Sequence, residues 1–446
     1  MKRIFAFLCV AVCLIAGQVR GEIYGVWKGM LLGQLPLVIH VVNDSTATLS
    51  SPAQGASEIP CDFARVNGDT LNISLKKLGA SFRGVYRPGA DKMRGLFVQG
   101  IPMQIEMARG VEADMYPDRP QTPVGPFEYR EEEVSFRNGD VELSGTLTIP
   151  SEPPTRPGGY TAVVLASGSG VQNRDEELFG HKPFAVIADK LTRSGIAVLR
   201  FDDRGAGKSS PRKGNETSAD NAADVMVAVD FLRGREEINS SKVGILGHSE
   251  GGTLAFINAA EWPDKVGFVV SLAGMAVKGE DLIVKQNTEV TALRGEPLGE
   301  EAVGTLRKAF RAIAEGEDSL SIAKDLRPLM KELHPNFSDA ELDAGIAAMT
   351  SPWYIAFVKL DPGEYLAKVK CPVLALNGTW DVQVDSEMNL RAIAGVLPGA
   401  KTVAPEGLNH MFQRSPTRAG SMNYGGISQT ISPEVLELIA SWISER

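Results

Sequence analysis

The pattern of hydrophobic and polar positions divides the chain into two regions. From residue 22 to about residue 115, short runs such as Leu37–Val42 and Thr70–Leu75 alternate between apolar and polar positions, and turn pairs such as Asn67-Gly68 separate them. A period of two residues with turns between the runs is typical of antiparallel β-strands. We therefore expect a small β-rich domain over residues 22–115.

A proline-rich stretch follows this region. Residues 116–126 hold four prolines and few apolar positions, a composition that favours an extended connection over a packed element. We predict an interdomain linker here, with the boundary near Gly125.

Beyond the linker the pattern becomes strand, glycine-rich turn, helix and strand again. This rhythm is typical of a mainly parallel sheet with helices on both faces, and we expect it to extend over residues 127–446. The expected strands are Thr161–Leu165, Ile196–Leu199, Val243–Leu246, Val266–Leu272 and Val373–Leu376, and the expected helices are Phe184–Leu191, Ala222–Leu232 and Pro433–Ile443.

One stretch lacks the strand pattern. From about residue 279 to residue 368 the periodicity is helical, and Ser338 followed by Glu341 has the spacing of a capping box. We predict a helical insertion that forms a cap.

The first 21 residues predict a signal peptide. A basic start precedes an apolar run from Ile4 to Ala16, and small residues follow. The run is too short to span the hydrocarbon of a bilayer, so an N-terminal membrane anchor is the weaker interpretation. Lipoprotein anchoring through Cys13 is poorly supported, because the small residue expected before a lipidated cysteine is absent and Val12 stands there. We therefore expect an exported protein, periplasmic or extracellular, without stable membrane insertion once the signal is removed.

The composition excludes some classes of binding partner. The 446 residues carry a formal net charge of -9, which argues against nucleic acid and anionic membranes because both favour a basic surface. Outside the signal segment the cysteines are Cys61 and Cys371. Two buried separate thiols are the favoured interpretation over a disulfide, and neither cysteine has the clustering of a zinc site.

The most informative motif is Gly-x-Ser-x-Gly at residues 247–251. An expected strand enters it and an expected helix follows, as in a turn that must present a serine hydroxyl outward. This context favours Ser249 as a nucleophile over a structural serine.

A serine nucleophile requires a base, and the chain has five histidines. His410 lies in a loop after the last expected strand, late in the chain, where this fold places its base. His181 is better explained by packing in its loop. His40 lies in the β domain and His334 in the insertion. His248 lies in the turn itself, with its side chain expected to point away from that of Ser249.

The oxyanion of an acyl-transfer intermediate requires two N–H donors. We assign one to the amide of Glu250, directly after Ser249. The second is expected from the loop Ser167–Gly170, where we favour the Ser169 amide, with Gly168 and Gly170 allowing close approach of substrate. A plain tight turn is the alternative.

For the carboxylate that orients the base we favour Asp381, in the loop after Val373–Leu376. Asp385 is the alternative, although it is well placed to cap a helix. Asp203 and Arg204 are interpreted as a buried ion pair that braces the oxyanion loop, with Arg174–Glu176 in the same network.

With these motifs in order, the chain resembles bacterial two-domain carboxylesterases of the α/β-hydrolase superfamily. The matching stretches are Ser167–Gly170, Arg174–Glu176, Asp202–Gly205, Gly247–Gly252, Asn377–Val384 and Leu408–Gln413. The resemblance implies an α/β-hydrolase domain with a helical cap, preceded by a β domain. It also implies a serine esterase for small-molecule, short-chain acyl esters that uses no metal or organic cofactor. One departure is Asp385, where proline often follows the valine.

Two other functions stay open on the sequence. A serine peptidase for short peptides uses the same turn, and a binding protein would use the β domain to hold glycan, with Trp27 and Tyr24 as a stacking platform. Aromatic residues in a small β domain are more often core. Trp353 and Tyr354, near the end of the insertion, are candidates for the wall of the acyl pocket, and packing against the hydrolase core is an equal alternative.

Overall fold

The computed structural model describes residues 23–31, 35–51, 56–87, 90–99, 101–110, 117–154 and 157–446. The chain forms two compact units, with the change near residue 111. The expected signal segment lies outside the described residues. Within the described ranges, no helix has the length and apolar character needed to cross a membrane.

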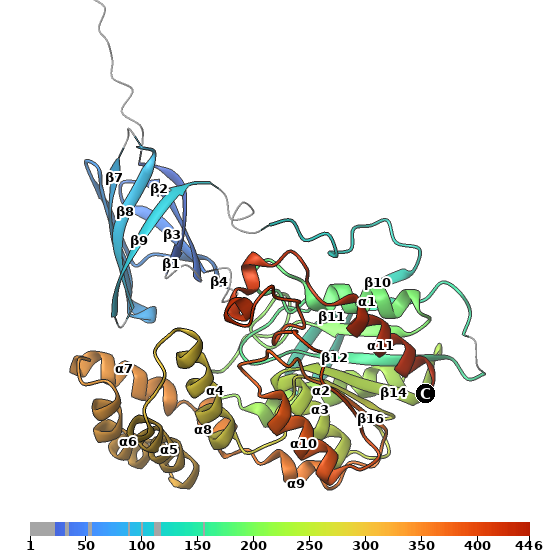
Figure 1. The fold of residues 1–446 in the computed structure, drawn as a ribbon. Helices are drawn as coiled ribbons and strands as arrows, with labels where there is room; N and C mark the ends of the chain where they lie inside the picture. The colour runs from blue at the N-terminus through green and yellow to red at the C-terminus, as the bar shows by residue number, and fades with distance from the viewer. Residues whose placement is uncertain are drawn as a thin grey trace, which may run out of the picture. The chain divides into compact units, whose positions relative to one another are not determined.

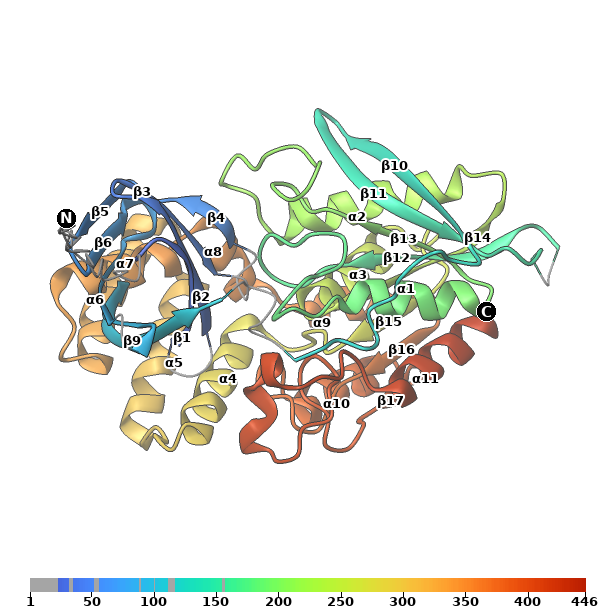
Figure 2. The ribbon, with the colours of Figure 1, turned by 90° about the horizontal axis from the view of Figure 1, so that it is seen from above.

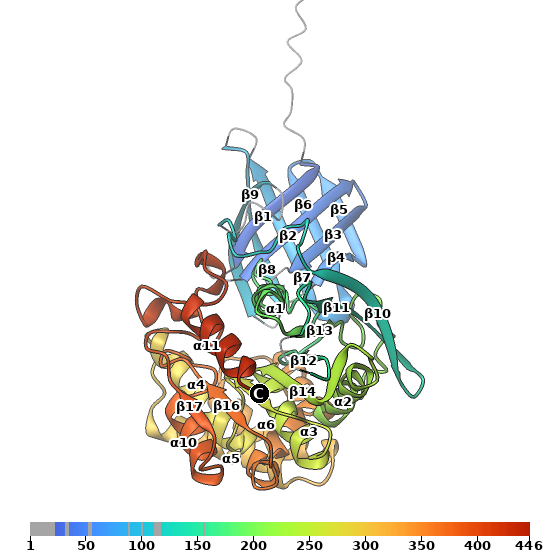
Figure 3. The same cartoon turned by 90° about the vertical axis from the view of Figure 1, so that its right-hand side faces the viewer.

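The N-terminal unit is a nine-stranded sheet with the order β4-β3-β2-β1-β9-β8-β7-β6-β5 (Figure 3). Neighbouring strands such as β7 and β8 pair antiparallel, as the period-two pattern predicts. The strands are β1 (Gly25–Leu31), β2 (Leu35–Asn43), β3 (Thr46–Ser51), β4 (Ala56–Pro60), β5 (Phe63–Asn67), β6 (Thr70–Leu75), β7 (Ala80–Arg87), β8 (Lys92–Gln99) and β9 (Ile101–Arg109).

Large apolar side chains fill one side of this sheet. Trp27 is 0% exposed, and its indole N–H donates to the carbonyl of Ile23 at 2.7 Å. Phe82 and Met107 are buried with it. Trp27 is therefore a core residue, and the glycan-platform interpretation is wrong because the ring has no free face. Cys61 is a free thiol that is half-buried, which corrects the expectation of a buried one.

The C-terminal unit holds an eight-stranded sheet with the order β10-β11-β13-β12-β14-β15-β16-β17 (Figures 1 and 2). From β13 onward neighbouring strands are parallel. The strands are β10 (Arg130–Asn138), β11 (Val141–Ile149), β12 (Tyr160–Ala166), β13 (Ala197–Phe201), β14 (Ile238–His248), β15 (Val269–Leu272), β16 (Val373–Leu376) and β17 (Lys401–Val403).

The sheet begins with an antiparallel hairpin, β10–β11, that was not expected from the sequence. β10 is rich in glutamate and mostly exposed, so its hydrophobic signal is weak. The Asn138-Gly139 pair in the turn could have predicted this hairpin, because Asn-Gly favours a tight turn between two strands. In the structure Gly139 adopts φ 58°, as such a turn requires. β15 also starts at Val269, three residues later than expected.

Helices cover both faces of this sheet, as expected for the fold. On one face α1 (Pro183–Arg193) and α11 (Pro433–Ser444) pack on Val163 and Leu165 of β12. On the other, helices pack on Ala162 and Val164. These are α2 (Ser218–Arg233), α3 (Glu250–Glu261), α9 (Pro362–Leu366) and α10 (Ser386–Val396). Alternate residues of one buried strand therefore supply two cores.

The expected helical insertion is present and has its own apolar core, which includes Phe310, Ile313 and Leu326. The capping box predicted at Ser338 is formed, with its hydroxyl accepting from the Glu341 amide. The cap helices are α4 (Gly279–Leu293), α5 (Glu300–Glu315), α6 (Ser319–Leu333), α7 (Asp339–Met349) and α8 (Pro352–Lys359). α9 joins the sheet core through Leu366, so the cap ends near Lys359 rather than at residue 368.

Candidate active site

Ser249 sits in a strained turn between β14 and α3. Its φ of 54° and ψ of -122° are unfavourable for a residue with a Cβ, and its amide donates to the carbonyl of Leu272 at 2.8 Å. Cβ atoms on Gly247 and Gly251 would lie 2.0 Å from backbone oxygens. Only glycine fits these two positions, so the spacing of the motif follows from the tightness of the turn.

His410 and Asp381 come together from two loops at the carboxyl ends of β17 and β16. Nδ1 of His410 lies 2.7 Å from Oδ2 of Asp381. The other carboxylate oxygen accepts the amides of Gln383 at 2.8 Å and Val384 at 2.9 Å. Each of the two side chains is 5% exposed. The carboxylate therefore holds the imidazole in one orientation, with Nδ1 directed away from the cavity that Ser249 and His410 share.

Asp385, the alternative acid, has a different role. Its side chain accepts the Met388 amide at 2.8 Å and caps α10, as expected. Its second oxygen lies 3.4 Å from Nζ of Lys285 in the cap.

The loop after β12 provides further backbone N–H groups, beside that of Glu250, as candidate donors to the oxyanion. The Gly168 amide is already occupied, because it donates to Oε1 of Glu176 at 2.7 Å. The Ser169 amide donates to no protein acceptor in the described part of the chain, and Ser169 lines the same cavity as Ser249. Gly170 adopts φ 99°, which lets the loop turn directly after Ser169.

Asp203 braces this loop by accepting the Ser167 hydroxyl at 2.7 Å and the Gln172 amide at 2.9 Å. Burial raises the pKa of Asp203 to about 7, against the effect of these hydrogen bonds. The expected ion pair between Asp203 and Arg204 is wrong. The chain leaves β13 and enters a turn over residues 203–206, and there Arg204 reaches Asp224 on α2 instead, at 2.5 and 2.8 Å.

The Arg174–Glu176 segment also differs from the expected single network. Arg174 donates to Asp202 and Asp175 accepts from Arg200. Glu176 turns inward to His248. The side chain of His248 was expected to point away from that of Ser249, and its ring bonds to Glu176 and to the carbonyl of His410.

The other histidines lie apart from these groups. His181 is fully buried, with Nδ1 2.9 Å from the Thr430 hydroxyl and Nε2 3.0 Å from the Tyr424 carbonyl. Burial, reinforced by Arg119, lowers its pKa to about 4. His334 stacks on Phe337 in the cap, and His40 belongs to β2 of the other unit.

Ser249 and His410 open into a cavity of about 390 Å³. Its apolar wall comes largely from the cap, through Leu282, Ile283, Trp353, Tyr354 and Phe357. Burial raises the pKa of Tyr354 to about 12, so its hydroxyl stays neutral. Both residues proposed from the sequence as a pocket wall therefore face the cavity.

Trp353 also connects the cap to the helix that follows Ser249. Its indole N–H donates to Oε1 of Glu250 at 3.1 Å, and the same oxygen accepts the Ser218 hydroxyl at 2.5 Å. The Trp353 ring stacks on Phe357 with centroids 5.3 Å apart. The sequence pointed only to the amide of Glu250, since no local pattern shows which distant donors a buried carboxylate meets.

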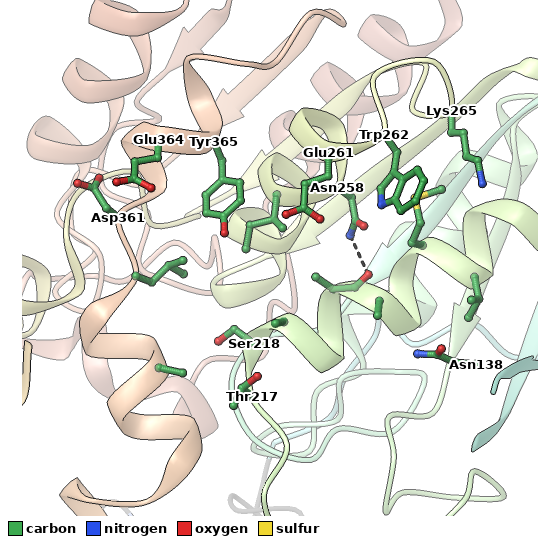
Figure 4. Close-up of a pocket in the computed structure, with 18 of the residues that line it drawn as sticks. Asn138, Thr217, Ser218, Asn258, Glu261, Trp262, Lys265, Asp361, Glu364 and Tyr365 are labelled. Atoms are coloured by element: carbon green, nitrogen blue, oxygen red, sulfur yellow. Dashed lines mark hydrogen bonds between the residues drawn. The ribbon is translucent and has the colours of Figure 1, made fainter. Parts of the chain in front are cut away.

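A second pocket, of about 600 Å³, lies between α2, α3 and the α9 segment (Figure 4). Trp262, Tyr365 and Glu261 line it, and the amide of Asn258 is held by the Ala222 carbonyl at 3.0 Å. Neither Ser249 nor His410 lines this pocket, so its size does not make it the reaction site.

The sheet order, the helices on both faces and the strained serine turn define the α/β-hydrolase fold. A family model described as "Serine aminopeptidase, S33" matches residues 182–306, which include this turn. Esterase EstD of Thermotoga maritima is 26% identical over 323 residues, covering 72% of this chain and 69% of that protein.

Two further similarities extend the comparison. A 2-hydroxy-6-oxononadienedioate/2-hydroxy-6-oxononatrienedioate hydrolase of Cupriavidus pinatubonensis is 26% identical over 288 residues, covering 63% of this chain and 86% of that protein. Among solved structures, Est1E from Butyrivibrio proteoclasticus with bound ferulic acid aligns with a TM-score of 0.42 at 17% identity, covering 70% of this chain and 96% of that one.

Proposed function

We propose that the protein, an ester hydrolase, cleaves short-chain carboxylic esters through an acyl-enzyme formed on Ser249, with His410 as base and Asp381 as its orienting carboxylate. The observation that carries this proposal is the 2.7 Å contact between His410 and Asp381 beside a cavity that also holds Ser249 in a strained, outward turn. These groups match the requirements of nucleophilic acyl transfer.

In the first half-reaction, Nε2 of His410 takes the proton of the Ser249 hydroxyl as Oγ attacks the ester carbonyl. The C–O bond to the alcohol then breaks, and the same proton passes to the leaving alkoxide. Asp381 fixes the tautomer and stabilises the imidazolium that forms between these steps. Water, activated by His410, then attacks the acyl-enzyme and releases the acid.

The negative oxygen of each tetrahedral intermediate is assigned to the amides of Glu250 and Ser169. Glu250 is the first residue of α3, where N–H groups have no partner within the helix. Ser169 contributes because its amide donates to no acceptor among the described residues, whereas the Gly168 amide is held by Glu176.

The cavity supports small acyl groups. A volume of about 390 Å³ lies near the lower end of the range for ligand pockets. Its apolar wall suits an alkyl chain, and the neutral Tyr354 introduces no charge there. These features support an acyl site against Trp353 and Phe357.

A serine peptidase is the second candidate, because the matching family model is described as a serine aminopeptidase. An aminopeptidase must bind the free ammonium of its substrate, which calls for an accessible carboxylate. Among the described residues that line the cavity, Glu176 is the one carboxylate; it is 1% exposed, and its Oε1 is engaged by Gly168 and His248. This arrangement favours the ester.

Purified protein assayed with p-nitrophenyl esters of increasing acyl length, beside aminoacyl anilides, tests the proposal. We expect the largest kcat/KM with the shortest acyl groups and little anilide cleavage. Faster cleavage of the anilides would replace the esterase by the peptidase.

We also propose that the enzyme works after export, on the strength of the basic and apolar pattern of residues 1–21. N-terminal sequencing of the protein from its native cells tests this, and a mature chain that still begins at Met1 would contradict it.

A further inference from the structure

Glu176 and His248 form a buried pair that contacts the oxyanion loop and the His410 loop and adjoins the Ser249 turn. Glu176 is 1% exposed and His248 is 7% exposed. Oε1 of Glu176 accepts the Gly168 amide of the oxyanion loop at 2.7 Å and lies 3.0 Å from Nδ1 of His248. Nε2 of His248 lies 3.0 Å from the backbone carbonyl of His410. His248 itself directly precedes Ser249.

The partners of His248 define its protons. A backbone carbonyl can only accept, so Nε2 must carry hydrogen. Nδ1 faces a carboxylate oxygen at 3.0 Å, so one proton lies between the two groups. Placed on Nδ1, that proton makes the ring an imidazolium, with Glu176 as the opposite charge inside the protein. Burial on its own lowers the pKa of His248, but Glu176 and the His410 carbonyl outweigh burial and raise it above its ordinary value.

The charges around this pair are few. His248 faces Glu176 and, further off, Asp381, and its ring centroid is 4.9 Å from that of His410. Asp203 lies on the other side of the oxyanion loop. It is close enough to Glu176 that the negative charge of Glu176 contributes to raising the pKa of Asp203. Oε2 of Glu176 is buried and has no hydrogen-bond partner among the described residues. Gly168 and His248 are thus the donors that this carboxylate uses.

We propose that Glu176 and His248 are a positioning pair that holds the oxyanion loop and the backbone of His410 in register around Ser249. The proposal rests on the proposed function, because it concerns how that site is kept in its active geometry. Neither side chain reacts. The pair is neutral as a unit, so it adds no net positive charge beside the imidazolium that His410 becomes during turnover.

A buried pair could instead contribute only to stability, and the two roles differ in what they change. Displacing a reacting group by about 1 Å can cost on the order of 100-fold in rate without changing substrate affinity. A role in stability alone lowers the melting temperature and leaves the turnover of the folded enzyme unchanged. The comparison must therefore separate kcat, KM and the melting temperature.

The experiment measures p-nitrophenyl acetate hydrolysis by full-length Glu176→Gln, His248→Asn and the double variant. We expect each single variant to lose about 10- to 100-fold in kcat with KM nearly unchanged. The double variant should lose no more than the worse single variant, because two members of one unit are not additive. Asp224→Asn is the matched control, since it breaks the buried Arg204 pair away from the cavity and should lower stability alone.

The pH profile gives a second readout. His248→Asn leaves the Glu176 carboxylate without its cation near His410, so the acidic limb of kcat/KM should move to higher pH, by about one unit. In the double variant the acidic limb of kcat/KM should return to its wild-type position, because the charges of both Glu176 and His248 are removed. Unchanged kcat and an unmoved limb in both single variants would overturn the proposal, as would losses that multiply in the double variant.

A second measurement covers variants that do not fold. NMR of the wild-type enzyme labelled with ¹⁵N-histidine should show both ring nitrogens of His248 protonated at neutral pH, and five histidines keep the spectrum simple. A His248 ring with one bare nitrogen would overturn the pair. If the wild-type protein fails to cleave the ester, or if Ser249→Ala still cleaves it, the proposed function is contradicted. The NMR result then still tests whether Glu176 and His248 form the pair.

Discussion

Oδ2 of Asp381 lies 2.7 Å from Nδ1 of His410, while Asp385, four residues further on, caps α10 and makes no hydrogen bond to that imidazole. The separation arises because the loop after β16 turns back through the amides of Gln383 and Val384, which both bind Asp381. One carboxylate is thus fixed beside the base and the other at a helix end.

Asp381→Asn should fold and lose on the order of 10⁴-fold in kcat, because the amide no longer fixes the tautomer or stabilises the imidazolium. Asp385→Ala should keep its activity and lose about 1 kcal/mol of unfolding free energy through the missing cap. Steady-state kinetics and thermal melts on both variants check this. The reverse pattern would move the acid to Asp385.

Ser249→Ala should keep the fold and substrate binding and lose about 10⁵- to 10⁶-fold in kcat, since only the nucleophilic oxygen is removed. A fluorophosphonate probe should label the wild type and leave this variant unlabelled. Peptide mapping that finds the label on another serine would refute the assignment of the nucleophile.

Trp353 is expected to set acyl length. Trp353→Ala should raise kcat/KM for longer acyl chains relative to acetate by about 10-fold, because truncating the wall lengthens the apolar cavity. Trp353→Phe is the matched control: it keeps an aromatic ring in the wall and removes the N–H that Glu250 accepts, together with the part of the indole that phenyl lacks. We expect it to lose about 1 kcal/mol of stability and to keep the wild-type chain-length profile.

The p-nitrophenyl ester series with melting curves distinguishes these outcomes. If Trp353→Ala unfolds, or melts far lower with an unaltered acyl preference, Trp353 is a packing residue of the cap.

His181 should make the protein sensitive to acid. Its pKa is lowered to about 4 in the folded state, against about 6.5 in an unfolded chain, so the unfolded chain binds the proton first as the pH falls. Stability is unaffected by this group above pH 6.5 and decreases between about pH 6.5 and pH 4, by about 3 kcal/mol in all.

Urea unfolding of the wild type and His181→Gln across this range measures the effect. The variant should show a shallower loss of stability on acidification, even if it is less stable at neutral pH. Parallel curves for the two proteins would show that other groups cause the acid sensitivity.

The sequence determined the features that depend on local geometry. Alternation with a period of two residues predicted the N-terminal strands, and buried runs separated by helical segments predicted the parallel sheet. The strained turn at Ser249 was readable because Gly247 and Gly251 are required wherever the backbone packs that tightly. The helix cap at Asp385 followed from its neighbours in the chain.

The tertiary structure alone decided the pairing of buried charges. Arg204 was expected beside Asp203 and lies against Asp224, and Glu176 was expected in that network and lies against His248. A hydrophobic pattern reports which face of an element is buried, and it contains no information on which distant side chain that face meets. The partners of a buried charge are set by strand order and by the turns of loops that come together only in the folded chain. This is why Ser249 and its turn could be assigned from the sequence, whereas the buried pair behind them became visible only once the loops were placed.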